Sequence, residues 1–358
     1  MLNKIRRIEM KRTLFAVMFV MLSMALVFAE AIGEVQDQET AGTQIFVDDL
    51  GREVELPGVI TRIAPSGSNA QVIVFQIAPE KLVGLASALG SDEKQIYPSY
   101  THDLPAFGTL YGKKANLNKE TLILADPEMI IDVGDIKGSV EDMAKDLDTI
   151  SSEVGVPVIF IEANMDNYPE VFRRLGKLLG YEERGEQLAE YYEEVVKTIE
   201  QYSSEKKPTV YISSSNDGLE AILAGKSHAQ CAEKAGAEVV VSSKIAQNGN
   251  ISLETLYQLD PEYIFVYTAE GYKTVTTNAL WATLSAVQNG KVYLVPNMPH
   301  GFIDSPVCSN RIVGLWYLAS IFYPEAGIDI VSRTQEFYSL FYGADITAEQ
   351  ARAILHLD

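Results

Sequence analysis

The chain has 358 residues, a length that suggests two domains, and 47% of them are hydrophobic, which argues against a disordered protein. Lys and Arg total 29 against 49 Asp and Glu, so the net charge is −20. This charge argues against a nucleic-acid partner and against polybasic attachment to a membrane surface. Cys231 and Cys308 are too few for a disulfide scaffold, and whether they pair with each other is left open.

The N-terminus has the pattern of a secretory signal. A basic segment up to Arg12 precedes an apolar run over residues 14–28, and Ala29-Glu30-Ala31 supplies a small-residue cleavage site. We predict a signal peptide over residues 1–31 and a flexible leader over residues 32–43; a retained signal anchor is the alternative. No later stretch is apolar enough to span a bilayer, so we expect a soluble protein outside the cytoplasm.

Apolar, strand-like runs then alternate with helical stretches. Strands are expected at residues 45–47, 82–85, 129–133 and 156–161, and again at 209–212, 238–241, 263–266 and 291–295. This alternation predicts an α/β fold with mostly parallel sheets flanked by helices. Residues 166–205 lack a strand signal, and Glu182 to Ser203 has the periodicity of one long helix. We therefore predict an N-terminal lobe (44–165), a bridging helix region (166–205) and a C-terminal lobe (206–358).

The two predicted lobes share an internal repeat. Residues 116–130 read NLNKETLILADPEMI and residues 250–264 read NISLETLYQLDPEYI, with more than half of the aligned positions identical. Asn118 and Ser252 are expected to cap a short helix, which leads through Asp-Pro-Glu into an apolar strand. The repeat predicts two lobes of like topology; recurrence of the same helix-to-strand pattern by convergence is the alternative.

Four blocks in order resemble a known family. They are FVDDLGREVELP at 46–57 followed by Arg62-Ile63, KLVGL at 81–85, residues 118–131, and residues 306–318 followed by Tyr323-Pro324. Together they resemble the substrate-binding proteins of ABC importers for iron complexes and vitamin B12. The resemblance implies two lobes bridged by one rigid helix, with the ligand in the cleft between them and no cofactor. The chain departs from the family at residues 65–71, where the usual Ser-x-Thr-Glu helix opening is absent.

The resemblance also implies a partner. Glu120 and Glu254 occupy matched positions in the two repeats, where the family has acidic residues that dock to arginines of the permease. We expect the protein, as a monomer, to dock to a permease dimer that works with ATPase subunits. The alternative is that a glutamate in a first helical turn only favours the helix dipole.

A ligand between the lobes would contact loops that follow strands, because open α/β sheets bind ligands there. The expected contacts are Ser68, Asn69, Tyr111, Ser214, Ser215, Tyr272, His300 and Arg311. No direct metal site is expected, although Tyr111 and His300 are possible ligands to the metal of a bound chelate. For each of these residues, ordinary loop packing is the alternative.

The supply of arginine bears on the ligand. Arg311 is the sole arginine between Lys207 and Val331, which disfavours a strongly anionic siderophore and favours a neutral or weakly charged metal complex. An iron complex, haem or cobalamin remains open. No catalytic motif is recognised, so no enzyme activity is expected. A secreted sensory or adhesive module and a hydrolase with an unrecognised site are the alternatives.

Overall fold

The structure is a computed structural model that describes residues 42–110, 115–203 and 207–357. The predicted signal peptide, nearly all of the predicted leader and Tyr111 lie outside these ranges. Two parallel sheets dominate the fold, as the alternating sequence pattern predicts. One has the strand order β3-β4-β5 and the other β7-β6-β8-β9.

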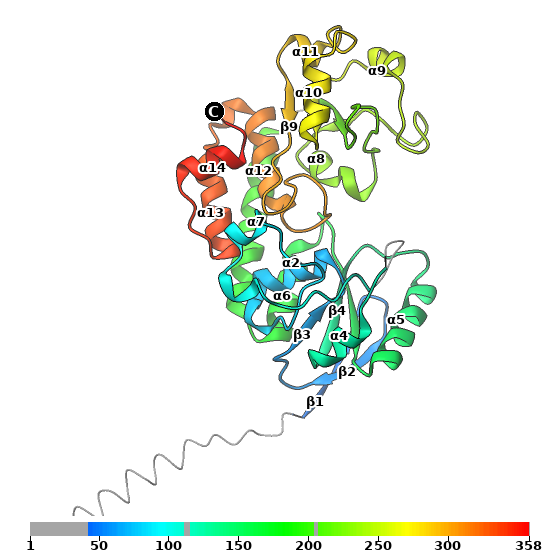
Figure 1. Ribbon diagram of the computed structural model, residues 1–358. Coiled ribbons are helices and arrows are strands. Elements are labelled where there is room, and N and C mark those ends of the chain that lie inside the picture. The colour runs from blue at the N-terminus through cyan, green and yellow to red at the C-terminus, as the bar shows by residue number, and fades with distance from the viewer. Residues whose placement is uncertain (1–41, 111–114, 204–206, 358) are drawn as a thin grey trace, which may run out of the picture. The chain divides into compact units, whose positions relative to one another are not determined.

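The sheet β3-β4-β5 with its helices forms what we call the N-terminal lobe (Figure 1). Its strand β4 is buried along its whole length, as expected of a parallel strand covered on both faces. The elements are β3 (Ile63–Pro65), α2 (Ser68–Ile77), α3 (Glu93–Ile96), α4 (Lys119–Leu124), β4 (Met129–Gly134), α5 (Val140–Val154), β5 (Val158–Glu162) and α6 (Tyr168–Leu179). The expected strand at residues 82–85 forms only isolated bridges, at Leu82 and Leu85.

The sheet β7-β6-β8-β9 with its helices forms the C-terminal lobe. Its elements are β6 (Thr209–Ser213), α8 (Gln230–Lys234), β7 (Glu238–Val239), α9 (Leu253–Leu259), β8 (Tyr263–Val266), α10 (Ala269–Thr277), α11 (Ser285–Gln288) and β9 (Val292–Leu294). Three further helices complete the chain: α12 (Arg311–Phe322), α13 (Ile330–Tyr342) and α14 (Ala348–Ile354).

The repeat forms the same local structure in both lobes. Asn118 caps α4 by accepting a hydrogen bond from the Thr121 amide, and Ser252 caps α9 through the Thr255 amide. After each helix comes an aspartate with positive φ, Asp126 or Asp260, and the chain then leads into a central strand of its sheet. The N-caps that the sequence predicts are therefore confirmed.

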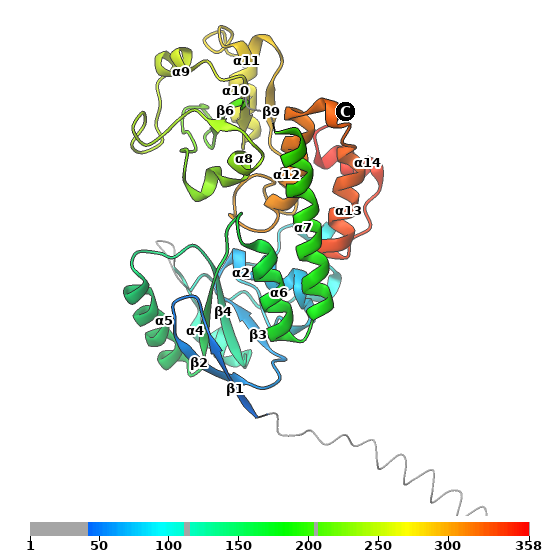
Figure 2. The same cartoon turned by 180° about the vertical axis from the view of Figure 1, so that it is seen from behind.

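The helix α7 (Glu182–Tyr202) links the lobes in sequence, and Figure 2 shows it running past α6 toward α12. Glycines bring α6 and α7 close together: a Cβ added at Gly185 would lie 2.5 Å from the carbonyl oxygen of Phe172. The C-terminal helices join the same core, because the ring centroid of Phe341 on α13 lies 6.0 Å from that of Phe172. The domain boundaries stay a prediction.

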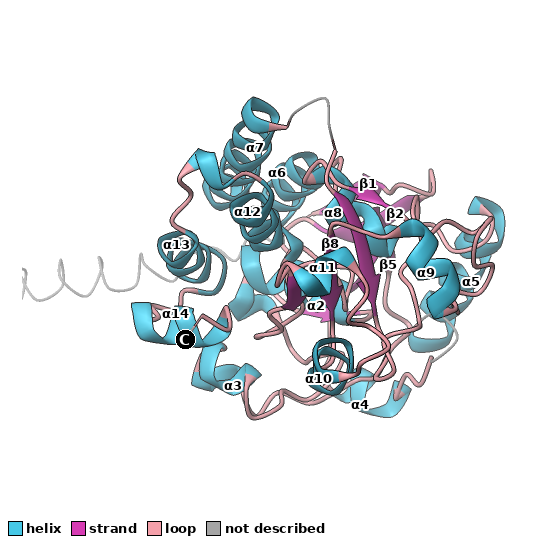
Figure 3. Ribbon diagram, turned by 90° about the horizontal axis from the view of Figure 1, so that it is seen from above, coloured by secondary structure: helices cyan, strands magenta, loops and turns pink. Residues whose placement is uncertain are grey.

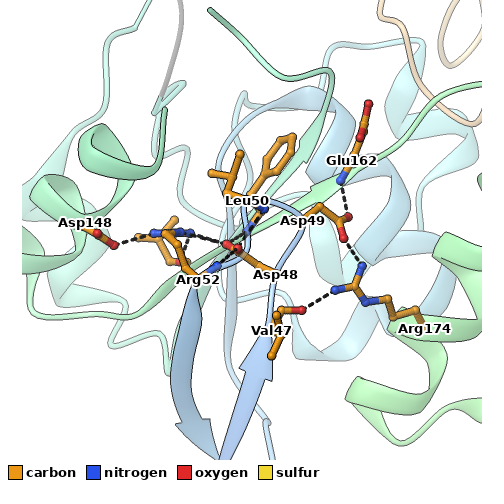
Figure 4. Close-up of polar contacts among 10 residues, drawn as sticks. Val47, Asp48, Asp49, Leu50, Arg52, Asp148, Glu162 and Arg174 are labelled. Atoms are coloured by element: carbon orange, nitrogen blue, oxygen red, sulfur yellow. Dashed lines mark hydrogen bonds and ion pairs between the residues drawn. The ribbon is translucent and has the colours of Figure 1, made fainter. Parts of the chain in front are cut away.

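Two aspartates at the start of the described chain anchor a hairpin of β1 (Thr43–Val47) and β2 (Glu53–Pro57) to the N-terminal lobe (Figure 4). The Asp48 carboxylate accepts hydrogen bonds from the Leu50, Arg52 and Phe160 amides and from the Arg52 guanidinium. Asp49 accepts from the Glu162 amide at 2.7 Å and pairs with Arg174 on α6. The block Phe46–Pro57 thus has a structural role, because it fastens the hairpin to β5 and α6.

Candidate functional site

The lobes contact each other where β4 ends. Asp135 follows β4, and its carboxylate accepts a hydrogen bond from the Ser227 hydroxyl of the C-terminal lobe, with 2.5 Å between Oγ and Oδ2. Loops at the carboxyl ends of parallel strands are where open α/β sheets bind ligands. The candidate site is therefore the edge at which the carboxyl ends of the two sets of strands meet.

In the N-terminal lobe, Ser68 and Asn69 begin α2 directly after β3. Ser68 is exposed and Asn69 is half-buried. The amide of Asn69 lies over the end of β4, since a Cβ added at Gly134 would be 3.3 Å from Asn69 Nδ2. Beneath them the Ser66 hydroxyl donates to Asp132, a buried carboxylate. This hydrogen bond ties the end of β3 to β4 and sets where α2 begins.

In the C-terminal lobe, Ser214 and Ser215 follow β6 and are half-buried. The Ser215 hydroxyl donates to Asp217 at 2.5 Å and accepts from the Glu220 amide at 2.9 Å. The Ser214 hydroxyl donates to the carbonyl oxygen of Glu220 at 3.4 Å, so both serines shape their own loop. The structure does not bring Tyr272, on α10, next to Ser68 and Asn69. Tyr272 instead lines a cavity of about 440 Å³ together with Tyr293 and Tyr317.

His300 is buried instead of facing open solvent. Its Nε2 lies 2.9 Å from the Tyr97 hydroxyl of the N-terminal lobe, and its Nδ1 lies 3.7 Å from a Glu93 carboxylate oxygen. Burial lowers the pKa of His300 to about 4, so the imidazole is neutral at pH 7. His300 thus packs between the lobes as a hydrogen-bonding group.

Arg311 is fully buried at the start of α12. Its guanidinium donates to the carbonyl oxygen of Ser227 at 2.9 Å and to the Tyr168 hydroxyl at 3.2 Å. It therefore joins the segment that contacts Asp135 to the first residue of α6. In this arrangement Arg311 lies behind the lobe contact and supports it.

A histidine–aspartate pair adjoins Arg311. His228 Nδ1 is 2.7 Å from the carboxylate of Asp304, which is buried, while the His228 side chain is 57% exposed. The hydrogen bond that His228 donates to Asp304 raises the pKa of His228. Tyr97, Asp135 and Asp304 were not predicted as site residues. The sequence could have indicated Asp135 alone, from its position directly after β4. Tyr97 and Asp304 join the site only through tertiary packing.

A cavity of about 440 Å³ opens beside these strand ends. Both lobes contribute to its lining: Asp92, Gln95 and Ile96 come from in and around α3, and Tyr267, Ala269, Asn297 and Met298 follow β8 and β9. Residues from Ile346 to His356, including part of α14, close one side. The volume lies in the range of about 300–1,000 Å³ that is typical of small-molecule sites. No lysine or arginine of the described chain lines this cavity.

The described residues contain neither a disulfide nor a cluster of metal-ligating side chains. Cys231 and Cys308 are both free and buried, and burial raises the pKa of each thiol to about 12. Within residues 42–110, 115–203 and 207–357, no group of three or more His, Cys, Asp or Glu side chains is placed to hold a metal ion. Across the same ranges, no helix is both long and apolar enough to cross a bilayer.

Comparison with known proteins decides the family. The model of the periplasmic binding protein family matches residues 77–299, more than half of the chain. The chain belongs to this family. The α/β fold agrees with that of an ABC transporter solute-binding protein from Sulfurospirillum deleyianum, at 29% identity and a TM-score of 0.77, over 87% of this chain and 99% of that one.

Two further similarities are more limited. Helicobacter pylori CeuE with Ni(II) bound matches at 18% identity and a TM-score of 0.64, over 87% of this chain and 99% of that one, which supports the fold alone. The Fe(3+)-citrate-binding protein YfmC of Bacillus subtilis (strain 168) is 28% identical over 203 residues, 52% of this chain. The match spans 58% of that relative's length.

Proposed function

We propose that this protein is an extracytoplasmic solute-binding protein that delivers a metal chelate to an ABC importer. The observation that carries the proposal is the meeting of two parallel sheets at their carboxyl ends, beside a cavity lined from both lobes. Membership of the periplasmic binding protein family supports it. The protein acts by binding and release, and its mature form begins near Ile32 after export.

The ligand contacts are proposed at the strand ends. The side chains that we assign to the ligand are Ser68 and Asn69 at the start of α2, Ser214 and Ser215 after β6, and Tyr111, whose assignment rests on the sequence alone. Tyr272 is not assigned, because it lines another cavity with Tyr293 and Tyr317. His300 and Arg311 support the site without contacting the ligand, because both are buried and hydrogen-bonded within the protein. The ligand carries little negative charge, because Arg311 is already engaged and no lysine or arginine among the described residues lines the cavity shared by the lobes.

Titration calorimetry with four probes tests the ligand class: ferric citrate, haem, cobalamin and a ferric tris-catecholate. We expect haem or cobalamin to bind more tightly than ferric citrate and the catecholate chelate, which are both strongly anionic, and Asn69→Ala to weaken that binding at least tenfold. Asn289→Ala is the matched control, because Asn289 is exposed and precedes β9 at its amino end. Tightest binding of ferric citrate or the catecholate would refute the charge argument, and no binding of any metal complex would refute the proposed ligand class.

Docking to the permease is proposed at Glu120 and Glu254. Both side chains are exposed, and each lies in the first turn of a capped helix of the repeat. Glu120→Arg and Glu254→Arg should each impair uptake in cells while solute affinity stays unchanged, because a like charge would then face a permease arginine. Glu349→Arg is the control, since Glu349 is an exposed first-turn glutamate on α14. Normal uptake by both variants would refute the docking assignment.

A further inference from the structure

Exposed apolar side chains lie beside both proposed docking glutamates. On α4, Ile123 is 49% exposed and Leu124 is 85% exposed. On α9, Tyr257 is 38% exposed, and its hydroxyl donates to the carbonyl oxygen of Leu280, itself 60% exposed. Seven other large apolar side chains of the described chain are also exposed, but these four gather at two places, Ile123 beside Leu124 and Tyr257 bonded to Leu280.

The two places correspond through the repeat. Ile123 follows Glu120 by three residues and Tyr257 follows Glu254 by three, so each apolar side chain neighbours its glutamate on the helix surface. The inward position is also matched, since Leu122 and Leu256 are fully buried. Both helices therefore bury one leucine and present an acid and an apolar group outward.

The glutamates have no ion-pair partner in the parts of the chain that the structure describes. Lys119, the neighbour of Glu120, pairs instead with Glu153, at 2.7 Å between Nζ and Oε2. Each glutamate is therefore available to a cation on another molecule. An exposed carboxylate beside an apolar side chain fits a partner that offers a cation bordered by apolar surface.

The helices α4 and α9 also lie on one side of the molecule. In both Figure 1 and Figure 3 they are found on the side away from α13 and α14. A single partner can therefore touch both. Two like patches, one on each lobe, require a partner that presents the same surface twice, and a twofold-symmetric dimer does this.

We infer that Ile123 with Leu124, and Tyr257 with Leu280, form two apolar contacts, one on each lobe, that bind the two like subunits of the permease dimer next to the glutamate contacts. This inference rests on the proposed function. The glutamates orient the complex and speed its formation, whereas the apolar side chains supply affinity that does not depend on salt. Docking therefore has an apolar component that persists at high ionic strength.

The test measures binding to the permease–ATPase complex of the same host in lipid nanodiscs, by biolayer interferometry at low and high salt. Leu124→Ser and Leu280→Ser should each weaken binding at least tenfold at both salt concentrations, with solute affinity and the thermal unfolding midpoint unchanged. Val59→Ser is the matched control, because Val59 is 59% exposed and lies outside α4 and α9. Glu120→Arg should instead weaken binding most at low salt.

The outcomes separate the inference from the proposed function. If the wild-type protein binds the complex and the two serine variants bind equally well, the apolar contacts are refuted and the proposed function stands. If the wild-type protein does not bind the complex at all, the proposed function itself fails. If the serine variants instead abolish self-association seen by analytical ultracentrifugation while complex binding is unchanged, the patches bind a second copy and the inference is overturned.

Discussion

Removal of the Asp48 carboxylate is expected to destabilise the protein strongly. The Asp48 side chain is fully buried, and it accepts five hydrogen bonds, from three backbone amides and two nitrogens of Arg52. Deleting one member of a buried ion pair leaves the other charge and several donors unsatisfied, which costs about 3–5 kcal/mol. Asp48→Ala should therefore lower the free energy of unfolding by about that amount.

A second carboxylate that pairs with Arg52 provides the control for the Asp48 variant. Its other carboxylate partner, Asp148, lies 2.8 Å away, and the Asp148 side chain is 69% exposed. Solvent screens such a pair, so Asp148→Ala should cost at most about 1 kcal/mol. Urea unfolding followed by circular dichroism measures both variants against the wild type. Equal losses for the two variants, or a loss under about 1 kcal/mol for Asp48→Ala, would refute the reasoning from burial.

Three further predictions concern packing, protonation and thiol reactivity. Gly314→Ala should lower the free energy of unfolding by about 1–3 kcal/mol in thermal unfolding, because the added Cβ would lie 1.8 Å from the backbone oxygen of Phe302. Gly90→Ala is the control and should change this free energy little, because the added Cβ has room there. Burial lowers the folded-state pKa of His300 to about 4, below the value of about 6.5 in the unfolded chain. The contribution of His300 to the free energy of unfolding is therefore complete above pH 6.5, and on the order of 3 kcal/mol is lost as the pH falls toward 4. Unfolding midpoints against pH should be flatter for His300→Gln, and identical curves would contradict this. Cys231 and Cys308 should resist a thiol reagent in the folded protein and react after unfolding, because both are buried with raised pKa values; rapid reaction of the folded protein would disprove it.

Local patterns predicted much of the scaffold. The long helix expected from Glu182 to Ser203 is α7, Glu182–Tyr202, because its apolar positions recur at helical spacing over many turns. The N-caps Asn118 and Ser252 were readable because a cap depends on residues only three positions away. The run at 82–85 was less predictable, since an apolar segment becomes a strand only where a neighbouring strand pairs with it continuously.

The sequence by itself determined the alternation of strands and helices, the repeat and the matched positions of Glu120 and Glu254, because these follow from short-range periodicity and from comparison of one segment with another. Only the tertiary structure decided that His300 meets Tyr97 and that Arg311 is fully buried against Tyr168. These partners are far apart along the chain, and their meeting depends on how whole elements pack. Whether a polar side chain faces a ligand or supports the fold from behind is therefore set by packing, and no local pattern encodes it.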